Sequence, residues 1–199
     1  WIHLGPLVTH NACVASRMLR DQAYPLVRAA WEVGSPQIRN RGTVAGNIIT
    51  ASPANDTISP LMALGAVVTL KSVNGERRIP LTDFYTGVRK NVMKPDEILT
   101  DIAFSGLRSN QRGTFIKFAL RRAQAISLVN VSVVLTFQND EEDTPIPQKL
   151  IEKAVITLGA VAPTIIHAQE AEGFLVGKHL DEETIEAAGL LAMKASRPI

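Results

Sequence analysis

The 199-residue sequence has very little cysteine and almost no net charge. Cys13 is the only cysteine, which excludes an intrachain disulfide, an all-cysteine zinc site and an iron-sulfur cluster held by this chain alone. It lies in an apolar helical pattern, so we expect a buried side chain rather than a nucleophile. Because 21 Lys and Arg residues face 19 Asp and Glu residues, the chain lacks the basic excess that neutralises a nucleic-acid backbone, and we expect no nucleic-acid partner.

Long apolar runs are also missing. None approaches the roughly 20 residues that span a bilayer, and the first residues lack the basic and then apolar pattern of a signal segment. We therefore expect no membrane partner and a cytoplasmic protein. The sequence begins with Trp1 rather than methionine, so we expect a translated segment before it.

Histidine is scarce and poorly placed for metal binding. The histidines are His3, His10, His167 and His179, and none is paired with a second strong ligand at a spacing of three or four residues. We expect no metal site and predict surface or capping positions for all four. The serine elbow G-x-S-x-G, the phosphate loop G-x-x-x-x-G-K-[ST] and the dinucleotide turn G-x-G-x-x-G are absent as well.

The first part of the sequence predicts short helices followed by strands. The expected elements are, in chain order, two short helices over 9–33, the loop 39–60, a helix ending near 64, strands over 66–73 and 76–80 joined at Asn74-Gly75, a helical turn at 81–87 and a strand over 97–104. Alternation along that last strand predicts two faces: Ile98, Thr100 and Ile102 on one, and Leu99, Asp101 and Ala103 on the other.

The second part has a different pattern, typical of an antiparallel meander. Three strand-like runs cover 113–123, 127–138 and 149–161, and an acidic, proline-bearing segment separates the last two. Two helices are expected to follow, the second capped by Asp181. The polar stretch 106–111 separates the two parts, so we predict an α+β chain with domains 1–108 and 109–199.

The segment RNRGTVAGNIITASPANDTISP, residues 39–60, has almost no bulk. Gly42 and Gly46 allow the main chain to turn sharply and approach a bulky group. A helix that begins just after this turn would direct amide groups and a positive dipole toward an anion, most often a phosphate, with Thr43 and Asn47 adding polar groups. Ordinary capped turns use the same residue types, so the residues alone favour a structural interpretation.

Charged residues nearby in the fold are candidates for the same ligand. Asp56 is placed to accept a hydrogen bond from a ribose hydroxyl or a ring N–H. Lys117 and Arg121 are predicted on one face of a strand and Arg122 on the other, so a basic face could meet an anion. The alternative is that these basic residues cover the solvent-exposed face of the sheet without binding a ligand, which accounts for the same pattern.

Several stretches together resemble a known family. They are VGSPQIRNRGTVAGNIITASPANDTISPLMALGAVVTL, LTDFYTG, DEILTDI, FIKFALRRAQAISLVNVSVVL and TLGAVAPTIIHAQEAEGFLVGKHL. In order and nearly end to end, they resemble the FAD-binding subunit or domain of the molybdenum hydroxylases, the family of xanthine dehydrogenase and carbon monoxide dehydrogenase. The pattern R-N-x-G-T-x-x-G-N followed by A-S-P-x-x-D is the most specific part.

The resemblance implies a fold and a cofactor site. It predicts the second lobe of a two-lobed FAD-binding domain, followed by a small C-terminal domain with a three-stranded antiparallel sheet and helices. The backbone of Thr43, Val44, Ala45, Gly46 and Asn47 is expected to hold the FAD pyrophosphate. Four further positions match cofactor contacts of the family: Asp56, the apolar Leu99, Lys117 near the flavin ring and Ile126 near its reactive edge.

The sequence departs from the family pattern in places. Ala45 stands where the family usually has a glycine, and Gln124 or Ala125 stands where it often has an acidic residue, which alters the charge beside the flavin. The family's first lobe, with an earlier glycine-pair loop, does not appear, and the chain stops short of the usual end. We expect a fragment with half of a cofactor cradle.

The resemblance implies an oxidoreductase component in which FAD passes electrons from iron-sulfur clusters to NAD or another acceptor. An iron-sulfur subunit and a molybdenum-cofactor subunit are the expected partners, and no side chain of this chain need act as an acid or base. Two alternatives stay open. One is a flavin-free module that docks onto such a complex, and the other is a free-standing flavin oxidase.

Overall fold

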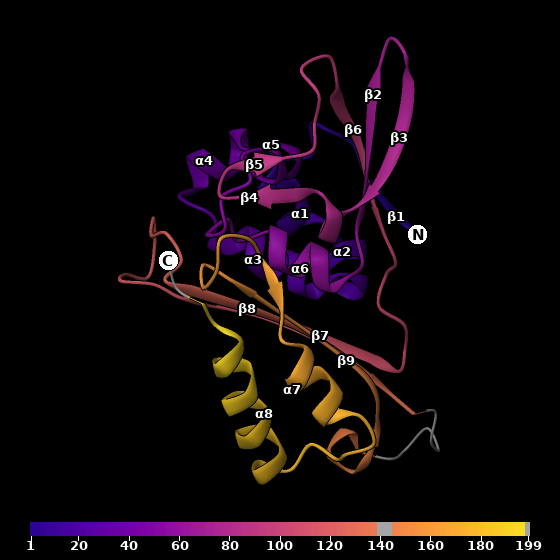
Figure 1. Cartoon of the computed structure of the whole chain (residues 1–199), viewed down its shortest axis with the longest axis vertical. Coiled ribbons are helices and arrows are strands. Elements are labelled where there is room, and N and C mark those ends of the chain that lie inside the picture. Colours follow the sequence, from indigo (N-terminus) through magenta and orange to yellow (C-terminus); the bar gives the residue numbers. More distant parts are fainter. Residues whose placement is uncertain (139–144, 198–199) are drawn as a thin grey trace.

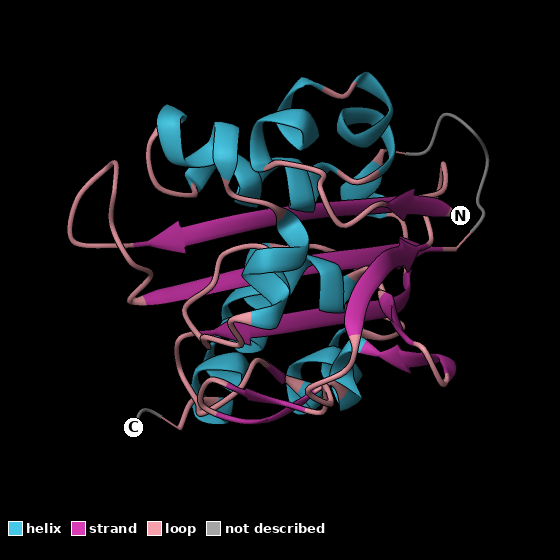
Figure 2. Cartoon of the chain, turned by 90° about the horizontal axis from the view of Figure 1, so that it is seen from above, coloured by secondary structure: helices cyan, strands magenta, loops and turns pink. Residues whose placement is uncertain are grey.

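A computed structural model of the chain describes residues 1–138 and 145–197. Most of the predicted acidic loop therefore lies outside the described residues. A helical layer, α1 to α6, lies on one side of a sheet of long strands, and α7 and α8 lie on the other side (Figure 1). Seen from above, the long strands run side by side across the molecule (Figure 2). The α+β architecture agrees with the prediction.

Three short helices, rather than two, cover the N-terminal region: α1 His10–Ala15, α2 Arg17–Gln22 and α3 Tyr24–Glu32. Thr9 caps α1, because its hydroxyl accepts from the backbone N–H of Ala12. The extra break occurs at Ser16, whose backbone is extended and whose hydroxyl accepts from the backbone N–H of Leu19. A serine that caps its own new helix ends the preceding one.

The predicted loop over 39–60 is mostly helical, which corrects that prediction. It holds the end of α4 Pro36–Arg41, all of α5 Val44–Ile49 and the start of α6 Ile58–Ala63. Ser35 and Thr43 cap α4 and α5 by accepting from backbone N–H groups three residues on. Serine and threonine at these positions satisfy amides that would otherwise lack partners, so even six-residue helices form.

The first sheet is antiparallel, with strand order β1-β6-β2-β3. Its strands are β1 Ile2–Leu4, β2 Val67–Ser72, β3 Gly75–Pro80 and β6 Ile98–Phe104. The hairpin is confirmed, although Ser72 pairs with Gly75, so the turn residues are Val73 and Asn74. The predicted helical turn appears as η1 Leu81–Asp83, and a small ribbon of β4 Tyr85–Gly87 and β5 Lys90–Asn91 follows it.

The predicted faces of β6 are wrong because the strand is irregular. Thr69 pairs with Asp101 while Leu70 pairs with Leu99, which leaves Thr100 as an extra residue. Such a bulge shifts the alternation by one position. Leu99 and Ile102 are therefore both buried, while Ile98 is 65% exposed.

The second sheet has strand order β10-β9-β8-β7, and its three long strands form the predicted meander. The strands are β7 Gln111–Phe118, β8 Val129–Phe137, β9 Ile151–Gly159 and the two-residue β10 Ile166–His167, with η2 Ile146–Gln148 before β9. The helices α7 Gln169–Leu175 and α8 Glu182–Ala195 follow. Asp181 caps α8 as predicted, with 2.8 Å between its Oδ1 and the backbone nitrogen of Thr184.

Two hydrophobic clusters hold these layers together. The larger one lies among the N-terminal helices and the first sheet, contains Phe84 and Phe104, and extends to Val134 of β8. The smaller one fills the space between the second sheet and α7 and α8, and contains Phe137 and Leu175. Because Val134 belongs to the first cluster, the two parts of the chain share a core at the inner face of the second sheet.

Within residues 1–138 and 145–197, no helix has the length and apolar character needed to cross a membrane.

Candidate functional site

A buried charge pair joins the helical layer to the second sheet. The Nζ of Lys117, near the end of β7, lies 2.7 Å from Oδ2 of Asp56, which precedes α6. The hydroxyl of Ser127 donates to Oδ1 of the same carboxylate, also at 2.7 Å. The side chains of Lys117 and Asp56 are only 4% and 8% exposed, so both oxygens of a buried carboxylate have donors.

Two opposing effects act on the pKa of Asp56. Burial raises the pKa of Asp56 above its ordinary value, whereas the hydrogen bonds from Lys117 and Ser127 act in the opposite direction. Lys117 also donates to the backbone oxygen of Glu32, at the end of α3, over 3.3 Å. An ammonium has three N–H groups, so one remains after these two contacts.

Lys117 faces a hollow of about 510 Å³. The wall consists of Glu32, Lys117, residues 118–123 and Ala125. Lys117, Arg121 and Arg122 outnumber the single acidic residue Glu32, so this hollow favours an anionic or electron-rich guest.

The strand prediction for the two arginines is wrong. β7 ends at Phe118, so Arg121 and Arg122 lie in the turn beyond it and not on opposite faces of a strand. The guanidinium of Arg121 donates to the carbonyl oxygens of Ala123 and Gln124. Gln124 adopts a φ of +51°, and Arg121 thus stabilises a tight turn at the rim of the hollow.

The turn around α5 satisfies most of its own amides. Val44 N–H donates to Val8, Gly46 N–H to the Thr43 hydroxyl, and Asn47 N–H to the Thr43 carbonyl. Among the residues that the structure describes, the backbone N–H of Ala45 has no acceptor. One amide in the first turn of α5 thus has no acceptor within the described part of the chain.

Ala45 is accommodated without strain. It is the second residue of α5 and is buried, and residues inside an α-helix have negative φ. A methyl group is compatible with that conformation, so the position does not require glycine. The departure from the family pattern leaves the local backbone helical.

Asn47 connects α5 to the Asp56 segment. Its side-chain oxygen accepts from the backbone N–H and hydroxyl of Thr57, and its carbonyl oxygen accepts from the side-chain amide of Asn55 at 2.6 Å. Asn47 therefore fixes the residues on either side of Asp56, which places the carboxylate beneath Lys117.

The remaining predicted residues lie in different surroundings. Leu99 is buried in the larger cluster on β6, the strand against which α5 packs. Ile126 is 70% exposed and directly precedes Ser127. The structure thus brings Asp56 and Lys117 into contact, and Ile126 directly precedes Ser127, which donates to Asp56. Sequence reasoning missed Ser127 and the carbonyl of Glu32, since a lone serine and a backbone oxygen give no sequence signal.

The histidine prediction is wrong at one position. His10 is 2% exposed, and burial together with the charge of Arg39 lowers its pKa to about 4. Its Nδ1 has no hydrogen-bond partner within the described part of the chain. Cys13 is buried as predicted, and burial raises the pKa of its thiol to about 12.

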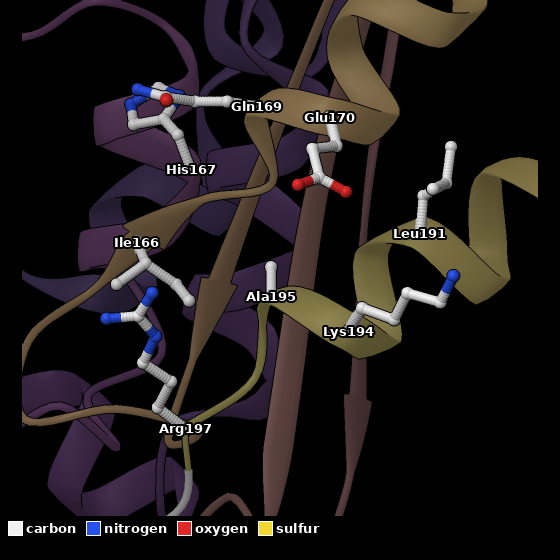
Figure 3. A pocket seen from close by; sticks show the side chains of 8 residues that line it. All are labelled: Ile166, His167, Gln169, Glu170, Leu191, Lys194, Ala195 and Arg197. Carbon is white, nitrogen blue, oxygen red and sulfur yellow. The ribbon is translucent and has the colours of Figure 1, made fainter.

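A second hollow, of about 480 Å³, lies among β10, α7 and α8. Figure 3 shows Glu170 reaching from α7 toward the end of α8, while His167 and Lys194 point to opposite sides. Nδ1 of His167 lies 2.9 Å from Oε1 of Glu172, which also accepts from the backbone of Ile156. The charged groups do not converge on one point, and residues 1–138 and 145–197 contain no group of three or more His, Cys, Asp or Glu residues suited to a metal ion.

Two family models match the chain. One, described as the FAD binding domain in molybdopterin dehydrogenase, covers residues 1–104. The other, described as the CO dehydrogenase flavoprotein C-terminal domain, covers residues 114–199.

Individual relatives agree with these matches. The chain is 35% identical to the nicotinate dehydrogenase FAD-subunit of Eubacterium barkeri over 94% of its own length and 61% of the relative's. It is 31% identical to the nicotine 6-hydroxylase medium subunit of Paenarthrobacter nicotinovorans over 98% of its length and 65% of the relative's. A chain of reconstituted CO dehydrogenase from Oligotropha carboxidovorans superposes with a TM-score of 0.88 and 27% identity, covering 99% of this chain and 65% of the other. The chain therefore spans less than two thirds of the length of these relatives.

Proposed function

Because the chain belongs to the family of FAD-binding domains in molybdopterin dehydrogenases, we propose that it is the FAD-holding, electron-transferring component of a molybdenum hydroxylase. FAD is the cofactor of this family, and it supplies electron-transfer chemistry when bound.

The donor groups of the site fit FAD. The free amide of Ala45 and the positive end of α5 suit one oxygen of a pyrophosphate. Lys117 lines a hollow that suits the carbonyl-bearing edge of a flavin ring, and two of the three N–H groups of its ammonium contact the protein. The chain offers one side of a cradle, with the amide of Ala45 on α5 for a phosphate and Lys117 for the ring.

The residues of the chain bind and orient rather than transfer protons. Lys117 holds a positive charge at a fixed point, since Asp56 and the carbonyl of Glu32 direct its ammonium. Asn47 fixes the segment that carries Asp56. The exposed apolar side chains of Phe118 and Ile126, at the two ends of the turn, supply a surface against which a ring could pack and exclude water.

The names of the relatives support a set of partner subunits. Their names describe an FAD-subunit and a medium subunit, which supports an assembly of this chain with an iron-sulfur subunit and a molybdenum-cofactor subunit. We propose that electrons enter through the iron-sulfur subunit and leave to NAD or another acceptor. A single buried cysteine supports a cytoplasmic location.

The observation that carries the proposal is the buried Lys117–Asp56 pair beside a hollow of positive character. Released-flavin analysis of the purified complex, with the visible absorption spectrum, tests it directly. We expect one FAD for each copy of this chain. A complex that contains the chain and its partners but no flavin would contradict the proposal and favour the flavin-free docking module.

A further inference from the structure

One short segment, residues 53–59, forms a polar seam along the second sheet. The carbonyl of Pro53 accepts from the backbone N–H of Ala160 at 2.8 Å. The hydroxyl of Ser59 donates to Oδ1 of Asn130 at 2.6 Å, and the carbonyl of Ser59 accepts from the hydroxyl of Thr157 at 2.8 Å. These contacts are neutral and lie on either side of Asp56.

The contact of Asp56 differs because it is charged and reaches Lys117. Neutral hydrogen bonds would be enough to hold the segment on the sheet, and a buried ion pair is a costly way to do so. Lys117 pairs with Asn130 in the sheet, and Asn130 pairs with Gly159, so the lysine begins a row that crosses the sheet under the seam. Lys117 is the charged residue of this row, and it lines the hollow.

Both oxygens of Asp56 are engaged within the protein, one by Ser127 and one by Lys117. The residue is 7% exposed. Both oxygens therefore have donors within the protein, and Asp56 is not one of the residues that line the hollow. The charged partner of the carboxylate is Lys117, at 2.7 Å, so Asp56 influences the site through that residue.

We propose that Asp56 is a positioning residue, held by Ser127, that orients the Lys117 ammonium toward the hollow and balances its charge, and that it thereby sets the reduction potential of the bound flavin. This inference rests on the proposed function. It assigns Asp56 a role through Lys117, in place of the direct cofactor contact that the resemblance implies.

The sign of the effect follows from charge. Two-electron reduction leaves more negative charge on the flavin ring, so a nearby cation favours the reduced form. Asp56 offsets part of the charge of Lys117. Removing the carboxylate charge should therefore leave a stronger cation at the ring and raise the reduction potential.

The test is a spectroscopic redox titration of the bound flavin, with dithionite as the electron donor, in the assembled complex. Asp56→Asn keeps the shape of the side chain and removes its charge. We expect the equilibrium constant for two-electron reduction to rise at least tenfold, which corresponds to about 30 mV. Asp56→Glu, which restores a carboxylate, should bring the potential back toward the wild-type value.

Ser59→Ala is the matched control. It removes the 2.6 Å hydrogen bond from Ser59 to Asn130 in the same seam, and it leaves Lys117 and the carboxylate of Asp56 unchanged. It should lower the stability of the complex and leave the potential unchanged. Equal potentials in Asp56→Asn, Ser59→Ala and wild type would overturn the proposal and leave Asp56 a purely structural contact.

A third variant serves if Asp56→Asn fails to fold. Ser127→Ala keeps the charge pair and removes a donor that partly neutralises the carboxylate. More of the carboxylate charge then offsets Lys117, so we expect a fall of about threefold in the same constant. A reduction potential that stays at the wild-type value in Ser127→Ala would also overturn the proposal. Absence of FAD from the wild-type complex overturns the proposed function together with this inference, whereas normal FAD content with unchanged potentials overturns this inference alone.

Discussion

Lys117 and Asp56 meet at 2.7 Å although 61 residues separate them along the chain. The pair joins a strand of the second sheet to the segment that precedes α6, with both side chains almost fully buried. A cation held in this way keeps its position beside the hollow because its partner is itself fixed by Ser127. The pair also has consequences for stability, which can be measured without the cofactor.

Replacing Lys117 with methionine should leave Asp56 as a buried carboxylate without its counter-charge. We expect the free energy of unfolding to fall by about 3 kcal/mol. The double variant Lys117→Met with Asp56→Asn should lose less than the sum of the two single variants, since each single change breaks the same pair. Denaturant unfolding of the four proteins measures this coupling.

Lys71→Met is a suitable control for that series, because Lys71 lies on β2 and is exposed. It should change the free energy of unfolding by less than about 0.5 kcal/mol. Strictly additive losses in the double variant would mean that Lys117 and Asp56 do not stabilise each other.

His10 should make the protein less stable in mild acid. Its folded pKa of about 4 lies below the unfolded value of about 6.5, so the unfolded chain takes up a proton first as the pH falls. The free energy of unfolding should therefore decrease between about pH 6.5 and pH 4, by up to roughly 3 kcal/mol from this group. His10→Gln should remove this part of the pH dependence, and unfolding curves with the same slope in both proteins would show that His10 is not the cause.

Glu97 should act in a lower pH range. Hydrogen bonds from Arg77 and from the backbone N–H of Lys94 lower its pKa to about 2. The unfolded carboxyl takes up its proton at higher pH than the folded one, so the stability that this pair contributes is lost as the pH falls from about 4.5 toward 2. Glu97→Gln should flatten the unfolding profile in that range alone, and an unchanged profile would contradict the assignment.

Two glycines should respond in opposite ways to alanine. A Cβ at Gly159 would collide with the side chain of Asn130, which is buried and accepts from Ser59, so Gly159→Ala should lower the free energy of unfolding by about 1 to 3 kcal/mol. Gly189 lies in α8 with open space around its Cβ position, and Gly189→Ala should raise it by about 0.5 to 1 kcal/mol. Thermal unfolding of both variants checks the difference, and a loss of stability in both would mean that a methyl group at position 189 does not fit on α8.

Local rules account for the parts of the fold that the sequence predicted well. The cap at Asp181 is confirmed because a side-chain oxygen and an amide three residues later are close together in the sequence. The three long strands of the second sheet are confirmed because their apolar alternation is regular. The break at Ser16 was missed, since a serine within an apolar helical pattern does not by itself indicate a new helix.

The features that could not be predicted from the sequence depend on packing between residues far apart in the chain. The faces of β6 depend on a bulge opposite Thr69 and Leu70, which only the pairing with β2 reveals. Asp56 and Lys117 were each predicted as site residues, yet their contact and the role of Ser127 follow from the way residues 53–59 lie on the second sheet. His10 is buried because α1 and α4 pack on one another, a relationship that no local pattern contains.

The most direct measurement of the central claim is the structure of the assembled complex with its FAD bound. We expect a polar atom of the flavin ring within about 3.5 Å of Lys117 Nζ, while Asp56 stays bound to Lys117 and Ser127. A flavin ring bound elsewhere, with Lys117 contacting only Asp56 and Glu32, would contradict it.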